Sequence, residues 1–172
     1  MTPQQRSLEP VQLDAYFALM ETASLLRHAV EQQLQDVGSL SYVQFQLLAT
    51  LGASATGSQR MTDLADGVVY SRSGLTYQAR ALEKRGLVIR ASSMDDERSI
   101  TVTITEEGRG VLGSVFPGHV AVLDDLLLDS LTRLDIENLA DILGRARDHM
   151  RRTPPRSAAP RRRKSPGADS TV

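Results

Sequence analysis

One segment of the chain changes its hydrophobic period abruptly, and this change limits the folds open to it. In the preceding part apolar residues recur every three or four positions, as in helices. Residues 100–105 (ITVTIT) then alternate strictly, with isoleucine and valine on one side and threonine on the other, as in a half-buried strand. Residues 87–91 (LVIRA) also suit a strand, and the polar stretch SSMDDERS separates the two. We therefore expect a β-hairpin with a long tip that follows a series of helices.

Two short helices directly precede this hairpin. The first, MTDLADGV, should begin at Thr62, and the second, RSGLTYQARALEKR, at Ser71. The second should end at Gly86, because glycine suits the left-handed position that ends many helices. Only the turn 67–70 separates them, so the pattern predicts a helix-turn-helix with the hairpin as its wing.

Two further helices are expected before this pair. Residues 11–37 carry apolar side chains every three or four positions, and Gly38 should stop that helix. Ser41 should cap the next one, with Gln44 completing a capping box. The glycine- and serine-rich stretch 52–59 should be a flexible loop.

Two more helices should follow the wing. The first should begin after Thr105 as its cap and continue to about Asp129, with a kink at Pro117. The last should begin at Thr132 and place its apolar residues between 136 and 150 on one face. Because these helices and the first one carry apolar stripes outside the small core of the helix-turn-helix, we expect them to pack against a second copy of the chain.

The predicted fold class is therefore mainly α with a small β-wing, a winged helix-turn-helix flanked by dimerisation helices. Residues 1–10 are expected to be flexible and 151–172, rich in Pro, Ser and Arg, to be a disordered basic tail. The domain between them should comprise a DNA-binding part at about 41–105 and dimerisation helices at about 11–37 and 106–150.

Composition excludes several kinds of site. The chain has no cysteine, so disulfides, thiolate metal sites and a cysteine nucleophile are all excluded. Aromatic residues make up only 4%, so the core should be aliphatic. The first ten residues lack the apolar centre of a signal peptide, and no uninterrupted apolar run approaches the ~20 residues of a membrane-spanning helix. A cytoplasmic protein is expected.

The charge is distributed unevenly along the chain. Residues 151–172 hold seven basic residues and one acid, whereas residues 1–150 carry a net charge of −7. The tail could move along the phosphate backbone of DNA, or it could be a solvated terminus. An acidic body can bind DNA only through locally placed basic groups.

The order of these elements resembles the MarR family of bacterial regulators over roughly residues 11–150. Three segments carry the resemblance: 61–88, the wing 95–109 with its Asp96-Glu97-Arg98 motif, and 131–143 (LTRLDIENLADIL). The resemblance implies a dimer held by the first and last two helices, a recognition helix at 72–85 and a wing arginine in the minor groove. It also implies a small, often aromatic and anionic, effector near the dimer interface.

The recognition helix offers a polar face opposite its apolar one. Leu75, Ala79 and Leu82 should face inward. Hydroxyl groups and arginine on the other side suit phosphates and base edges of the major groove, although a solvated helix face would show the same pattern. The candidate DNA-binding residues on this helix are Ser71, Arg72, Ser73, Thr76, Tyr77 and Arg80.

In the wing, Arg98 lies among acids, so a surface salt-bridge cluster is one interpretation. The other is that Asp96 orients the Arg98 guanidinium towards a narrow minor groove, where the potential is most negative. Arg90 on the first wing strand is a further phosphate candidate. Arg60, Lys84 and Arg85 are weaker ones, and Arg85 could instead pair with acids inside the domain.

Other motifs point to no enzyme. Residues 108–113 match G-x-G-x-x-G, but acids precede them and no second parallel strand follows, so the glycines more plausibly permit close helix packing. The three histidines lack metal-ligand spacing, and no nucleophile–base pair is present. No cofactor is expected. Candidate effector-pocket residues are Tyr16, His28, Tyr42 and His119.

The function expected from the sequence is a DNA-binding transcriptional regulator, a ligand-responsive repressor that acts as a homodimer on a pseudo-palindromic operator. The alternative is a small-molecule-binding or protein-interaction module with the same fold but no sequence-specific DNA binding, which the acidic body favours.

Overall fold

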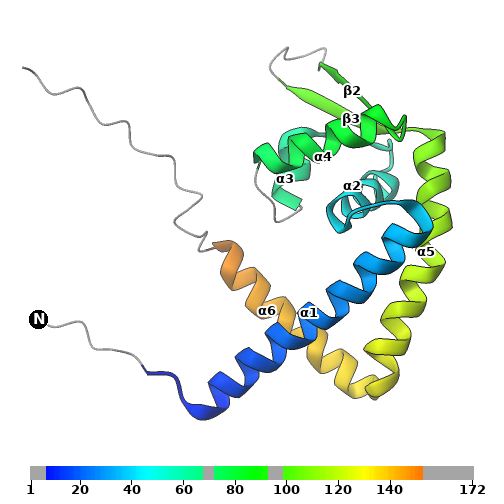
Figure 1. The fold of residues 1–172 in the computed structure, drawn as a ribbon. Helices are drawn as coiled ribbons and strands as arrows, with labels where there is room; N and C mark the ends of the chain where they lie inside the picture. Colours follow the sequence, from blue (N-terminus) through cyan, green and yellow to red (C-terminus); the bar gives the residue numbers. More distant parts are fainter. Residues whose placement is uncertain (1–6, 68–71, 93–98, 153–172) are drawn as a thin grey trace, which may run out of the picture. The chain divides into compact units, whose positions relative to one another are not determined.

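The computed structural model of the chain describes residues 7–67, 72–92 and 99–152. It divides into two units, one ending at Ser130 and one beginning at Leu131, and each is described by itself. The elements are α1 (Pro10–Gly38), α2 (Tyr42–Ala53), β1 (Ser58–Arg60), α3 (Met61–Gly67), α4 (Arg72–Lys84), β2 (Val88–Ser92), β3 (Ile100–Ile104), α5 (Glu106–Leu126), a 3-10 turn (Leu128–Ser130) and α6 (Arg133–Arg152) (Figure 1). The expected class is confirmed: mainly helical with a small antiparallel sheet and a wing.

The sheet has three strands rather than the two of the expected hairpin. Its order is β1–β3–β2, with Arg90 opposite Val102 and Ser58 opposite Thr103. The loop expected at 52–59 is therefore wrong at both ends, since α2 continues to Ala53 and β1 begins at Ser58. The Ser58 and Thr103 hydroxyl oxygens lie 2.7 Å apart, so this short strand is held by a residue distant in sequence.

The core is aliphatic, as expected, with Phe45 as its only buried aromatic ring among the described residues. It joins the carboxyl half of α1 to α2, the helix-turn-helix and the inner face of the wing. The side chains that are almost completely buried are Leu34, Leu40, Leu47, Leu48, Leu51, Leu64, Leu75, Leu82, Leu87, Val88, Val102 and Val115.

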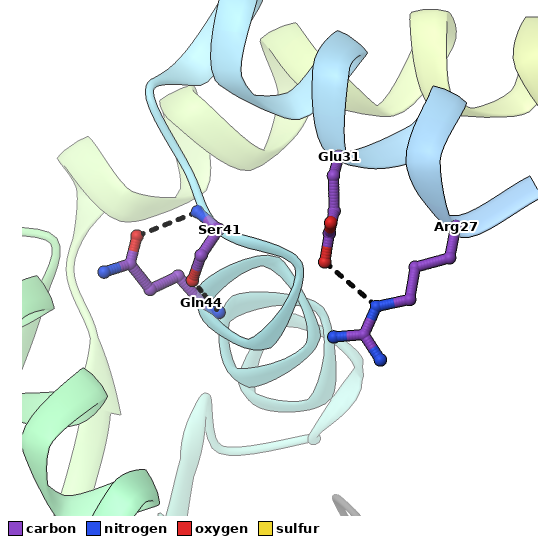
Figure 2. A network of polar contacts seen from close by, with 4 residues as sticks. All are labelled: Arg27, Glu31, Ser41 and Gln44. Atoms are coloured by element: carbon purple, nitrogen blue, oxygen red, sulfur yellow. Dashed lines mark hydrogen bonds and ion pairs between the residues drawn. The ribbon is translucent and has the colours of Figure 1, made fainter. Parts of the chain in front are cut away.

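Helix caps follow the expected local patterns. The Ser41 hydroxyl accepts from the Gln44 amide while the Gln44 side chain accepts from the Ser41 amide, which completes the capping box (Figure 2). The Thr105 hydroxyl accepts from the backbone of Gly108 at the start of α5. Thr132 bonds to the Asp135 carboxylate before α6, and these hydrogen bonds lower the pKa of Asp135.

The end of α1 differs from the expectation. Gly38 does not stop the helix; the left-handed residue is Ser39, with φ of 48°. A Cβ atom at Gly38 would lie 2.5 Å from Val115 Cγ1, so this position needs glycine for close packing against α5. The Ser39 amide donates to Gln35 and the Leu40 amide to Leu34, which closes the helix with a Schellman-type turn.

The glycine after α4 is needed for its backbone conformation, whereas one glycine of α5 is needed for close packing. Gly86 has φ of +73°, which confirms it as the left-handed residue after α4. A Cβ at Gly108 would collide with the Leu87 carbonyl, so close packing is confirmed there. Gly110 and Gly113 have open space around them, so that interpretation is wrong for the rest of the G-x-G-x-x-G segment.

Long helices leave apolar surface open. Residues 106–130 are long and apolar enough to cross a membrane by length and composition alone, with a mean hydropathy of 1.5 and only 6% of the window buried. In this structure α5 contacts both α1 and α2 (Figure 1). The kink expected at Pro117 stays a prediction. Exposed large apolar side chains include Leu13, Tyr16, Phe17 and Met20 on α1, Phe116, Val120 and Leu126 on α5, and Leu134, Ile142, Leu143 and Met150 on α6.

Candidate nucleic-acid interface

The inner face of α4 anchors it in the core. Leu75, Ala79 and Leu82 are all 0% exposed, as the sequence predicted. Their spacing of four and three residues places them on one side of the helix. The opposite side must therefore face solvent, and the helix-turn-helix presents it away from the core.

Three of the proposed DNA-contacting side chains form one stripe on that open side. Ser73, Tyr77 and Arg80 recur at intervals of four and three residues and are exposed, Tyr77 at 71%. The stripe combines a hydroxyl, a phenol and a guanidinium, which suit phosphates and base edges. Thr76, beside the stripe, is half-buried and has an interaction within the molecule.

For four other DNA-binding candidates the structure does not describe the side chain. Arg72 begins α4, but its side chain is outside the described part of the structure. Ser71, Asp96 and Arg98 also lie outside the described residues. Their proposed contacts therefore stay predictions.

Arg90 is held inside the domain. Its guanidinium lies 3.2 Å from the Glu83 carboxylate, and its side chain is only 10% exposed. This ion pair joins β2 to α4, and the phosphate contact proposed for Arg90 stays a prediction. This pair also neutralises a carboxylate that would otherwise repel DNA beside the exposed stripe.

Within the described ranges Arg85 bonds to backbone carbonyls and pairs with no acid, which corrects one of its expected roles. Its two terminal nitrogens donate to the carbonyls of Ser39, at 2.7 Å, and of Gly38, at 2.9 Å. These are carbonyls at the carboxyl end of α1, where the helix dipole is negative. The end of the recognition helix is therefore bonded to the end of α1.

A second polar contact links α4 to the same corner. The Gln44 side-chain nitrogen donates to the Gln78 side-chain oxygen at 2.9 Å. Neither contact was predicted from the sequence. The unpaired carbonyls that end every helix could have indicated a partner for Arg85, whereas nothing in the sequence pattern indicates Gln78.

The four candidate pocket residues are not gathered in one cavity. Tyr16 packs edge-on against Phe17, with ring centroids 5.3 Å apart, and is half-exposed. Tyr42 lies under the Arg27 guanidinium, which is 5.4 Å from its ring and is itself paired with Glu31 (Figure 2).

The two histidines among these candidates lie in different surroundings. His28 is exposed and lines an open cavity of about 500 Å³ together with Glu31, Gln32, Gln35, Asp36, Leu40 and Ser41. His119 instead packs on Phe45, with ring centroids 4.5 Å apart, and burial lowers the pKa of His119. Its Nδ1 is buried with no hydrogen-bond partner among the described residues. The four candidate pocket residues therefore lie at separate positions on α1, α2 and α5, and His28 alone among them lines the cavity described above.

Metal chemistry finds no support in this arrangement. Within the ranges that the structure describes, no group of three or more His, Asp or Glu side chains could hold a metal ion.

A helix pair with an exposed polar stripe, followed by a two-stranded wing, defines a winged helix-turn-helix protein. Comparisons with known proteins identify the family. The MarR family model matches residues 40–100. The crystal structure of AbsC, a MarR family transcriptional regulator from Streptomyces coelicolor, is 30% identical and has a TM-score of 0.80. The similarity covers 86% of this chain and 99% of AbsC. The chain therefore belongs to the MarR family.

Other relatives agree with this assignment. The regulator Sco3205 from Streptomyces coelicolor, solved in complex with DNA, is 29% identical with a TM-score of 0.82, over 91% of this chain and 96% of that one. The HTH-type transcriptional regulator MhqR of Bacillus subtilis (strain 168) is 32% identical over 89 residues, which is 52% of this chain. That match spans 61% of MhqR, less than two thirds of its length.

Proposed function

We propose that this protein is a transcriptional regulator that binds a pseudo-palindromic operator as a homodimer and represses transcription. The observation that carries the proposal is the stripe of Ser73, Tyr77 and Arg80 on the open side of α4. The core fixes the opposite side of the helix, so the stripe is available to the major groove. The neighbouring Glu83 carboxylate is neutralised by Arg90.

The relatives support the same function. Sco3205 was solved with DNA, and its similarity covers 91% of this chain. The transcriptional repressor YetL of Bacillus subtilis (strain 168), 24% identical over 115 residues, favours repression over activation. Family membership and the apolar side chains exposed on α1, α5 and α6 support the homodimer, since a solvated monomer rarely leaves so much apolar surface open. We place the protein in the cytoplasm with its DNA.

An effector that releases the protein from DNA is part of the proposal. The cavity beside His28 provides room of about 500 Å³, although Tyr16, Tyr42 and His119 do not line it. Most residues that line it carry a hydrogen-bonding group on an aliphatic stem, which suits a ligand with both apolar and hydrogen-bonding groups. Screening of small metabolites against the operator complex tests this part.

Selection of duplexes from a random-sequence library by the full-length protein tests DNA binding itself. Arg80→Ala and Tyr77→Ala are then compared with Arg133→Ala, which removes an arginine that is 93% exposed on α6. We expect a lost bidentate base contact to weaken binding by about 1–3 kcal/mol and to relax the preference at one base pair. Arg133→Ala should bind like the wild type.

Two outcomes would contradict the proposal. The first is that no duplex is enriched, which would favour a small-molecule or protein-interaction module on this fold. The second is that Arg80→Ala and Tyr77→Ala retain full affinity while removal of the basic tail abolishes binding. The tail would then be the DNA-binding segment.

A further inference from the structure

We infer that Gln78 and Arg85 are positioning residues that fix the recognition helix to the corner between α1 and α2, and so set the spacing of the two recognition helices in the dimer. This inference rests on the proposed function, because the spacing acquires meaning from the two half-sites of an operator. Neither residue belongs to the exposed stripe.

Gln78 lies in the middle of α4, and Arg85 directly follows its last residue, Lys84, in the turn that ends the helix. Both side chains make their contacts with the segment that joins α1 to α2. Leu82 lies between them and is 0% exposed, as is Leu75 one turn before Gln78. The apolar inner side of α4 is thus supplemented by two polar contacts to the corner formed by residues 38–44, one from the helix itself and one from the residue that follows it.

Arg85 makes the contact at the carboxyl end of α4. The turn at Ser39 uses the carbonyls of Leu34 and Gln35 for its own backbone hydrogen bonds. The carbonyls of Gly38 and Ser39 accept instead from the Arg85 guanidinium, at 2.9 and 2.7 Å. A planar guanidinium that donates through two nitrogens restrains direction as well as distance, which one hydrogen bond does not.

Gln78 makes the second contact, one that involves the cap of α2. The Gln44 side-chain oxygen accepts from the Ser41 amide at 3.1 Å, so the capping box fixes the orientation of its amide group (Figure 2). Its nitrogen is thereby directed to Gln78, at 2.9 Å. Gln44, the third residue of α2, therefore both completes the cap of its own helix and contacts the middle of α4.

Helix α1 extends this connection to the proposed dimer interface. Its 29 residues span about 43 Å at 1.5 Å per residue. Its amino half carries exposed apolar side chains such as Phe17 and Met20, and its carboxyl end accepts from Arg85. A change of angle at the Arg85 contact therefore changes the position of α4 relative to the dimer interface.

Pulsed electron paramagnetic resonance tests the inference without DNA. The chain has no cysteine, so Tyr77→Cys provides a single site for a spin label, on an exposed position of α4. The distance distribution between the two labels of the dimer is measured with Arg85→Ala, Gln78→Ala and both together. Lys84→Ala is the matched control, since it removes the same charge from an adjacent exposed residue of α4. Arg85→Lys tests rescue, and circular dichroism and sedimentation establish folding and mass for each variant.

We expect a narrow distribution for the parent and for Lys84→Ala, and a broader or displaced one for Arg85→Ala and Gln78→Ala. The double variant should show the largest change, and Arg85→Lys an intermediate one. Equal distributions for Arg85→Ala and Lys84→Ala would overturn the inference. Absence of any dipolar signal from the parent would overturn it together with the proposed dimer.

DNA titrations give the second readout. The duplex selected by the wild-type protein is compared with duplexes in which one base pair is inserted or removed between the half-sites. We expect Arg85→Ala to reduce the preference for the selected spacing by about fivefold, the effect of roughly one net hydrogen bond. The salt dependence should not change, whereas loss of a phosphate contact lowers the log–log slope by about 0.9.

The failures of the two proposals can be told apart. If the wild type enriches no duplex but the label distances respond to Arg85→Ala, the proposed function fails and the anchoring stands. If the wild type enriches a duplex but Arg85→Ala changes only the salt slope, Arg85 is a phosphate ligand and the positioning role is wrong.

Discussion

The carboxyl end of α1 places a serine, Ser39, in the left-handed conformation that glycine adopts in many helices, while the glycine lies one residue earlier, at position 38. A residue with positive φ usually ends the helix, and glycine adopts that conformation at least cost. Here serine takes the left-handed position, while the glycine one residue earlier makes room for Val115. The position of the glycine is therefore determined by contact between α1 and α5 and not by the turn.

This difference predicts the effect of adding one methyl group at position 38. Gly38→Ala places a Cβ 2.5 Å from a methyl group of Val115, which is fully buried and cannot move freely. We expect a loss of about 1–3 kcal/mol in the free energy of unfolding, measured by chemical denaturation. Gly110→Ala, in α5 with open space around it, should stabilise by up to about 1 kcal/mol. Equal effects of the two substitutions would contradict the packing argument.

His119 is a second residue whose surroundings predict a measurable property. Burial against Phe45 disfavours its charged form and lowers the pKa of the folded state below the value of about 6.5 in the unfolded chain. Between these two values the unfolded chain binds more protons than the folded one. The contribution of His119 to stability is therefore full above pH 6.5 and is lost as the pH falls through this window.

Replacement of His119 by glutamine should remove this part of the pH dependence. The free energy of unfolding, followed by denaturation between pH 7 and pH 5, should decline less steeply in His119→Gln than in the wild type. His28→Gln makes the same replacement at an exposed histidine and serves as the matched control for the substitution itself. A slope in His119→Gln identical to that of the wild type would assign the dependence to other groups.

At the scale of elements, the sequence predicts those helix ends and helix faces that depend on residues only a few positions apart. The capping pairs Ser41–Gln44 and Thr132–Asp135 and the left-handed Gly86 all act within a few positions, so their patterns are visible in the chain. The inward and outward sides of α4 follow from its period in the same way. Periodicity thus accounts for the helices, the wing and the exposed stripe.

Features that depend on distant residues could not be predicted in this way. The strand β1 is three residues long and is stabilised by pairing with β3, more than forty positions away. Arg85 and Gln78 find their partners on α1 and α2, and Arg90 finds Glu83 across a turn. In the sequence these three polar residues look like ordinary surface residues, and their partners become evident only in the folded structure.

The wing permits a prediction of its own. Residues 93–98 between β2 and β3 include Arg98, for which a minor-groove contact is proposed. We expect Arg98→Ala to weaken binding most on operators with narrow, A·T-rich flanks, because the potential in the groove rises as the groove narrows. Titration on paired duplexes with A·T-rich and G·C-rich flanks measures this. A uniform loss on both would indicate an ordinary phosphate contact instead.

At the scale of the whole molecule, the groups proposed to contact DNA and most of the exposed apolar side chains belong to different elements. Residues 1–150 carry a net charge of −7, so general attraction to DNA is weak and recognition depends on local groups on α4 and the wing. Most of the large apolar side chains that are exposed belong to α1, α5 and α6 instead, with Tyr77 and Ile89 among the exceptions. This separation suits a protein that associates through one region and contacts DNA through another.

Dimerisation is the prediction that belongs to this scale. Sedimentation at micromolar concentration should give a mass near twice 18.8 kDa. Phe17→Glu places a charge on an apolar side chain that is 61% exposed on α1, and it should shift the mass towards the monomer. Ile89→Glu makes the same kind of change at a 59% exposed position on the wing and should leave the dimer intact. A monomeric wild type, or dissociation by both variants, would contradict the proposed interface.

The two sides of α4 also bear on how such a protein acquires new targets. Its inner side packs in the apolar core, Gln78 accepts from the capping residue Gln44, and Arg85 donates to main-chain carbonyls, which remain when surrounding side chains change. Ser73, Tyr77 and Arg80 are not among the residues that hold α4 in place. Mutations at these three positions can therefore change the preferred operator while α4 stays in the same position. After gene duplication, two copies of such a protein can come to regulate different genes with the same fold.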